Sequence, residues 1–256
     1  MLFSFLKRSS QTHLFVFQSL RVVALNGRLY VNVNLYTVEG IDRATKLGMA
    51  PARVADIAYT PLLHNVTKVF EPQEGQTLPD VFGRLLVVFR NPIERALNRY
   101  EQVRLIPGND QMTLHQYAKD PKHSENNPLT RGILAFGPDD PLESSDVTRA
   151  QQVIKDLILV GLFDRFDEAL ERFERYFSWY ANDVAPQVNI CHGEVWDSYS
   201  TGYTVHEDYK TLDARGYNLI LAQHRMDVLL YRFAQALFDN QGAALQAASI
   251  ASSKRS

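Results

Sequence analysis

The chain has 256 residues, and its 27 basic and 29 acidic side chains leave a formal net charge of −2. This near balance argues against a protein that coats nucleic acid or a membrane surface, since either role needs an extended basic patch. Hydrophobic residues make up 45% of the sequence, enough for a large core, and the single cysteine excludes an internal disulfide. We expect one domain over residues 1–241, followed by a flexible Ala- and Ser-rich tail over residues 242–256.

Apolar runs alternate with helical patterns along the chain. Strands are expected near residues 29–34, 54–59, 85–89 and 157–160, with helices over residues 38–47 and 146–157. This alternation predicts an α/β fold, in which a parallel β-sheet carries helices on both faces. Looser stretches rich in Pro, Gly, Asn and Asp separate these elements further on, and long loops of this kind often shape a binding cleft.

The transition from strand to helix around Arg90 is the most informative stretch. Residues 85–89 are apolar, and Pro92 suits the first turn of a helix because its missing N–H costs nothing there. Arg90 then lies at the carboxyl end of a strand, beside a helix N-terminus whose unpaired N–H groups and dipole favour a phosphate or sulfate group. The alternative is that Arg90 and Arg95 are ordinary surface or salt-bridging residues.

Residues 90–98 resemble the motif R-x-P-x-x-R-x-x-S with which sulfotransferases hold the 3'-phosphate of their donor, 3'-phosphoadenosine 5'-phosphosulfate (PAPS). Arg90, Pro92 and Arg95 match the motif, and Asn98 stands in place of its serine. Residues 158–177 resemble the strand, turn and helix that follow in the same superfamily, and residues 224–241 are similar to the closing helix of glycan 2-O-sulfotransferase-like proteins. Between the first two blocks, residues 127–134 resemble a donor- or acceptor-side helix. The resemblance covers residues 29–241 and implies the P-loop-NTPase-like sulfotransferase fold, a central parallel β-sheet flanked by helices.

The resemblance also implies roles for individual residues. Arg90 and Asn98 would bind the 3'-phosphate, Asn98 through its amide. Asn127 and Arg131, in a block similar to a donor- or acceptor-side helix, would contribute to substrate binding. His64 follows the expected strand 54–59 and would act as the catalytic base, although a lone histidine also serves structural roles.

The loop that wraps the 5'-phosphosulfate in this family, Pro-Lys-Thr-Gly-Gly-Thr, has no direct counterpart. Residues 2–12 resemble a degraded version of it, in which Ser9 and Ser10 replace the glycines and Thr12 closes the loop. Lys7 would neutralise charge on the bridging oxygen as the sulfuryl group leaves. Serines would leave less room for the 5'-phosphosulfate in this loop, because glycine allows the backbone to approach an anion closely. Alternatively, Lys7 belongs to the exposed polar start of a truncated N-terminus.

The implied function is a PAPS-dependent sulfotransferase that transfers a sulfuryl group to a carbohydrate hydroxyl. PAPS is the co-substrate, and no metal is needed; the sequence also lacks the usual spacings of metal ligands. One alternative is a catalytically inactive relative that retains nucleotide or glycan binding. Another is a kinase-like transferase, disfavoured because no Walker lysine or metal-holding acidic residues are evident.

The sequence has no apolar stretch long enough to span a bilayer, so the chain is expected to be soluble as written. Similar glycan-modifying enzymes work in the Golgi lumen behind an N-terminal anchor, which would be missing here. Asn65, Val66 and Thr67 form a glycosylation sequon that matters only in a secretory compartment. Nucleic acid is not an expected partner, and the oligomeric state is left open.

Overall fold

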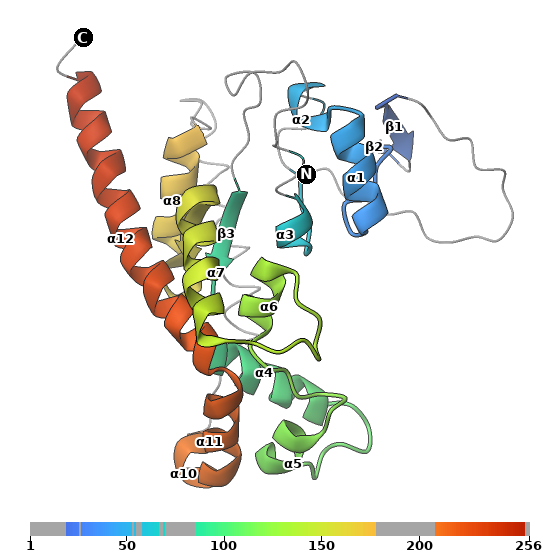
Figure 1. The fold of residues 1–256 in the computed structure, drawn as a ribbon, viewed down its shortest axis with the longest axis vertical. Helices are drawn as coiled ribbons and strands as arrows, with labels where there is room; N and C mark the ends of the chain where they lie inside the picture. The colour runs from blue at the N-terminus through green and yellow to red at the C-terminus, as the bar shows by residue number, and fades with distance from the viewer. Residues whose placement is uncertain are drawn as a thin grey trace, which may run out of the picture. The chain divides into compact units, whose positions relative to one another are not determined.

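A computed structural model describes residues 19–25, 27–52, 54, 58–66, 69, 85–177 and 208–253. Figure 1 shows the fold of the chain, which divides into two compact units, Met1–Leu85 and Leu86–Ser256. Among the described residues, each unit contains a hydrophobic cluster of its own. The division falls at the start of a strand, inside the range for which one domain is predicted. Lys7, Ser9, Ser10 and Thr12 lie outside the described residues.

The first unit begins with a β-hairpin. Strand β1 (Val22–Leu25) pairs antiparallel with β2 (Arg28–Val31), and Leu25 stands opposite Arg28. Asn26 and Gly27 separate the strands in the sequence, and Gly27 has a φ of 74°, which glycine adopts without strain. An Asn-Gly pair between two strands is typical of a two-residue hairpin. Placing a parallel strand at residues 29–34 was therefore wrong, because its partner is the adjacent strand.

The other regular elements described in the first unit are helices. The predicted helix at residues 38–47 is confirmed as α1 (Val38–Lys46), whose N-cap Thr37 accepts a hydrogen bond from the Gly40 N–H at 3.1 Å. Two short helices follow, α2 (Met49–Ala52) and α3 (Leu63–Val66). Of the expected strand 54–59, the described positions 54, 58 and 59 are not in a strand. The core of this unit consists of Val33, Leu35, Ile41, Ala44, Met49, Val66 and Val69.

The second unit is mostly helical around a small sheet. Strands β3 (Leu85–Phe89) and β4 (Ile158–Leu162) form a two-stranded parallel sheet. The helices between them are α4 (Pro92–Arg104), α5 (Leu114–Lys119), α6 (Pro128–Leu134) and α7 (Ser144–Leu157). After β4 come the 3-10 turn η3 (Phe163–Arg165), α8 (Phe166–Phe177), α10 (Tyr209–Leu212), α11 (Ala214–Gln223) and α12 (Arg225–Ser253). The mixed α/β class is confirmed, whereas the wider sheet of a sulfotransferase fold stays a prediction.

The long helix α12 organises this unit. It runs alongside α7 and α8 and packs against β4, with Leu230, Ala234 and Phe238 fully buried (Figure 1). It continues to Ser253, through most of the stretch predicted to be a flexible tail. The Ala-rich composition of that stretch explains the extension, since alanine has the highest helix propensity.

Gln241 of α12 pairs with the backbone of β4. Its Oε1 accepts from the Val160 N–H at 2.9 Å, and its Nε2 donates to the Ile158 carbonyl at 2.9 Å. Residues two apart on a strand direct their hydrogen-bonding groups to the same edge. One edge of β4 is therefore paired with a side-chain amide, and the other with β3.

A second packed region lies where α4, α5, α10 and α11 meet. Three buried tyrosines contact one another there, with ring centroids 5.3 Å apart for Tyr100 and Tyr117 and 5.5 Å apart for Tyr100 and Tyr209. The Tyr100 hydroxyl donates to the Met112 carbonyl at 2.8 Å. Burial raises the pKa of Tyr117 to about 12, so its hydroxyl stays protonated at neutral pH.

Candidate functional site

The junction between β3 and α4 has the geometry that the sequence predicts. Asn91 is the N-cap of α4, and its Oδ1 accepts from the Ile93 N–H at 3.0 Å. Pro92 occupies the first turn, as expected from its fixed φ. Arg90 therefore stands between the buried end of β3 and a capped helix N-terminus.

Arg90 contacts the residue that follows β4. Its guanidinium carbon lies 4.6 Å from the centre of the Phe163 ring, within the range of a cation–π interaction. Phe163 comes directly after the last residue of β4, so the carboxyl ends of both parallel strands meet at this point. Ligand sites of open α/β folds gather at such edges.

Asn98 does not share an exposed face with Arg95. Asn98 is 5% exposed, whereas 41% of the Arg95 side chain is exposed. Helix α4 is contacted by α11 and α12 in addition to its own apolar packing, so its buried surface is wider than the apolar pattern indicates. Asn98 is therefore packed inside the unit, and its role in binding the 3'-phosphate stays a prediction.

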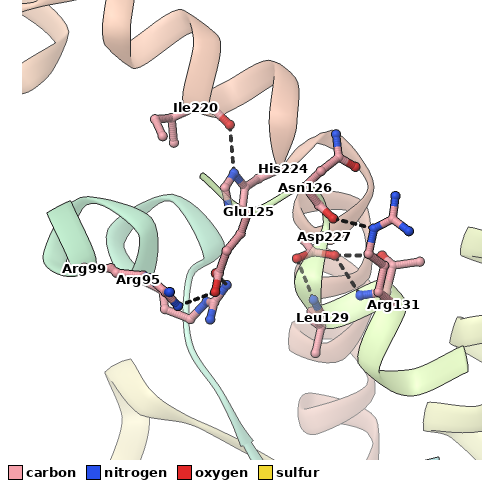
Figure 2. Close-up of polar contacts among 10 residues, drawn as sticks. Arg95, Arg99, Glu125, Asn126, Leu129, Arg131, Ile220, His224 and Asp227 are labelled. Carbon is pink, nitrogen blue, oxygen red and sulfur yellow. Dashed lines mark hydrogen bonds and ion pairs between the residues drawn. The ribbon is translucent and has the colours of Figure 1, made fainter. Parts of the chain in front are cut away.

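Asn127 and Asp227 cap each other's helices across the second unit. The Oδ1 atom of Asn127 accepts from the N–H groups of Met226 and Asp227 at 2.8 and 3.2 Å. In return, the fully buried carboxylate of Asp227 accepts from Leu129 N and Thr130 N at 2.9 and 2.8 Å. It also accepts from the Thr130 hydroxyl at 2.7 Å. Figure 2 shows Asp227 at the start of α6, where it satisfies the N–H groups that a helix leaves unpaired.

Arg131 holds the loop that follows α6. Its Nε donates to the Asn126 carbonyl at 2.8 Å, and its NH1 donates to the carbonyls of Gly137 and Asp140. Asn127 and Arg131, expected to bind substrate, thus both bond to the backbone of their own chain. A binding role for either residue stays a prediction.

The remaining predicted site residues belong to other parts of the chain. His64 is exposed on α3 of the first unit, whereas Arg90, Asn98, Asn127 and Arg131 belong to the second. Lys7, Ser9, Ser10 and Thr12 lie outside the described residues.

A charged cluster that the sequence did not reveal lies beside α4. Arg95 and Arg99, one turn apart, both bind the carboxylate of Glu125, which lies between α5 and α6 (Figure 2). Arg95 bonds to Oε2 at 2.7 Å, and Arg99 bonds to Oε1. Their spacing of four residues places them on one helix face, but nothing local in the sequence identifies Glu125 as their partner.

His224, between α11 and α12, is buried beside this cluster. It is 1% exposed, and its Nδ1 lies 3.0 Å from the Ile220 carbonyl. A carbonyl oxygen can only accept, which assigns the proton to Nδ1 and leaves Nε2 as an acceptor. Within the described part of the chain, Nε2 has no hydrogen-bond partner. Burial lowers the pKa of His224, with an additional lowering by Arg95, while Asp227 and Glu125 act in the opposite direction.

The described residues contain neither a candidate metal site nor a candidate membrane span. No group of three or more His, Cys, Asp or Glu side chains in these parts of the chain could hold a metal ion. Among the same residues, no helix is long and apolar enough to cross a membrane.

Comparisons with known proteins leave the family open. No family model, curated protein or solved structure matches the chain.

Proposed function

We propose that the chain is a sulfotransferase that uses PAPS to sulfate a hydroxyl group of a carbohydrate acceptor. The observation that supports this proposal most directly is the junction at Arg90. There an arginine lies at the carboxyl end of a parallel strand, beside a capped helix N-terminus and in contact with the residue that follows the second strand. A phosphate at this place would interact with both a fixed cation and the positive end of the α4 dipole.

Arg90 is suited to the 3'-phosphate of the donor. Its guanidinium is planar and can bind two phosphate oxygens at once, and stacking on Phe163 restricts the orientation of that plane. Asn98 is buried behind the exposed surface of α4, so in our proposal it supports the helix and Arg90 supplies the main phosphate contact.

The proposed reaction is an in-line transfer of the sulfuryl group. The acceptor oxygen attacks sulfur while the bond between sulfur and the oxygen of the 5'-phosphate breaks. His64 takes the proton of the acceptor hydroxyl, and Lys7 neutralises the charge that develops on the leaving oxygen. Ser9, Ser10 and Thr12 would contact the 5'-phosphosulfate, and the reaction would take place in the Golgi lumen.

Binding without turnover is the second candidate. It is favoured by the serines at positions 9 and 10, where the family loop has glycines, and by the burial of Asn98. Both departures affect the groups that would align the donor. Turnover separates this candidate from the first, because both predict nucleotide binding.

The experiment that tests the donor site is calorimetric binding of 3'-phosphoadenosine 5'-phosphate, compared with adenosine 5'-phosphate. We expect a clear preference for the first ligand, and Arg90→Ala should weaken its binding by roughly 10- to 100-fold, the equivalent of one charge-assisted contact. Arg175→Ala removes an equal charge from the exposed surface of α8 and should leave binding unchanged. Equal affinity for the two nucleotides, or no effect of Arg90→Ala, would contradict the assignment.

Turnover is tested by following label from PAPS into a panel of oligosaccharides. His64→Ala should abolish transfer and spare nucleotide binding, since His64 acts on the acceptor. Undiminished transfer in this variant would remove His64 from the mechanism. Nucleotide binding without transfer to any acceptor by the unmodified protein would favour the non-catalytic relative.

A further inference from the structure

We propose that Arg95 and Arg99 form a second anion site, which binds a phosphate group and which the carboxylate of Glu125 occupies in this structure. The site is distinct from Arg90 and needs neither PAPS nor turnover. Its ligand would be a free phosphate ion or a phosphate ester, and Glu125 would act as an internal competitor for it.

The geometry is that of two cations that share one small anion. Arg95 and Arg99 project from the same face of α4, and each bonds to a different oxygen of Glu125 (Figure 2). A phosphate group has more oxygens than a carboxylate and a larger charge, so it can accept from both guanidinium groups and bond to each more extensively.

Both arginines remain accessible while they bind Glu125. Their side chains are 41% and 45% exposed, and that of Glu125 is 24% exposed. Within the residues that the structure describes, Glu125 is the only hydrogen-bond or ion-pair partner of either guanidinium. The cluster therefore keeps one uncompensated positive charge and has donors directed to solvent.

Replacing the Glu125 carboxylate with a phosphate ligand would cost little free energy. Ion pairs at this degree of exposure are individually weak, because water screens them and the side chains lose entropy when they pair. A phosphate dianion attracts two guanidinium groups more strongly than a carboxylate does, although it must also give up part of its own hydration. The balance favours displacement at moderate phosphate concentration.

Only the side chain of Glu125 has to move when a phosphate displaces it. The backbone on either side of Glu125 is fixed by bonds from Ser124 N to the Asp120 carbonyl at 2.8 Å and from Asn127 N to the Gln223 carbonyl at 2.9 Å. Arg131 holds the Asn126 carbonyl as well. Glu125 can thus leave the arginines by rotating about its side-chain bonds, without unfolding of the loop.

His224 is buried near the same cluster, and the charges of Arg95 and Glu125 both act on its ring. Its Nε2 is a buried acceptor, so it cannot donate to a phosphate. The proposed site therefore consists of the two guanidinium groups, with Glu125 as their present partner.

The test is a phosphate titration observed through the arginine Nε–Hε signals in NMR spectra of the full chain, at constant ionic strength. We expect saturable shifts of the Arg95 and Arg99 signals with inorganic phosphate. Glu125→Gln should tighten binding by about tenfold, since it removes the competing carboxylate from both arginines. Glu171→Gln, which neutralises an exposed carboxylate on α8, is the matched control and should change affinity less than about twofold.

Two outcomes would overturn the proposal. One is an absence of saturable shifts at both arginines in the unmodified chain and in Glu125→Gln. The other is equal tightening by Glu125→Gln and Glu171→Gln, which would show an effect of net charge alone. Far-UV circular dichroism identical to that of the unmodified chain establishes that each variant is folded.

A glycerol phosphate titration distinguishes the source of the group. Binding equal to that of inorganic phosphate assigns the site to phosphate esters as well, and binding of the inorganic ion alone assigns it to free phosphate. The readout follows the Arg95 and Arg99 signals and uses no nucleotide, so it can succeed or fail whether or not Arg90 binds the donor.

Discussion

Replacing Asp227 with alanine tests how the second unit is held together. The carboxylate is fully buried and accepts three hydrogen bonds, two from the first turn of α6 and one from the Thr130 hydroxyl. Asp227→Ala leaves these donors without their acceptor. We expect a loss of about 3–5 kcal/mol in the free energy of unfolding, the range typical of breaking a buried charged network. A loss of this size is a large part of the total stability of an ordinary domain.

Two further variants measure how much individual hydrogen-bonding groups contribute to the stability of this region. Thr130→Val removes only the hydroxyl donor and keeps the side-chain volume, so it should cost about 1 kcal/mol. Asn127→Ala removes the acceptor for the first turn of α12 and should cost about 1–2 kcal/mol, as for other helix caps. Because each side chain caps the helix next to the other residue, the double variant should depart from additivity by about 0.5–3 kcal/mol.

Urea denaturation followed by far-UV circular dichroism measures these values, and hydrogen exchange locates them. In Asp227→Ala, the amide protons of Leu129 and Thr130 should exchange much faster than those of α7, which keeps its own capping. A loss below about 1 kcal/mol for Asp227→Ala, or exchange at α6 that is unchanged, would refute the reasoning.

Two other predictions concern charge and space in the second unit. Burial lowers the pKa of His224, so the unfolded chain takes up a proton before the folded chain does as the pH falls below the ordinary value of 6.5; stability should decrease in that range. The charged groups that act on the ring are Asp227 of α12, Arg95 of α4 and Glu125. His224→Leu should flatten the dependence of the unfolding free energy on pH between 7 and 5. An unchanged slope would contradict this account. Gly216→Ala should destabilise by about 1–3 kcal/mol or more in urea denaturation, because its Cβ would lie 2.6 Å from the backbone nitrogen of His115. Gly132→Ala, with open space around its Cβ in α6, is the control and should be neutral or stabilising, so similar losses for both would refute the steric argument.

The parts of the fold that local chemistry determines could be predicted from the sequence. The strand at residues 85–89 and the helix that follows it are confirmed, because the apolar run, the Asn91 cap and Pro92 all act within a few residues. The Asn-Gly pair between β1 and β2 is a local signal for their hairpin. The alternation of apolar runs and helical patterns carries no information on which strand pairs with Arg28–Val31, so it alone could not distinguish a hairpin from a parallel sheet.

The arrangement of the candidate site could not be predicted in the same way. Arg95 and Arg99 are visible as a helical pair, but Glu125 reaches them through the fold of the intervening chain. The pairing of Asn127 with Asp227 joins helices that lie far apart in the sequence. An aspartate near the start of an apolar helix needs hydrogen-bond donors if it is buried, yet the sequence does not identify which groups donate to it.

The pairing of Gln241 with β4 affects how this protein can assemble. An open strand edge is a template on which another chain can add a strand, and folded proteins commonly protect such edges. Here the amide of Gln241 already bonds to the donor and acceptor groups of Val160 and Ile158, and α12 lies against the strand. A second molecule could extend the sheet at this edge only if α12 first moved away, so the helix protects the chain against aggregation through β4.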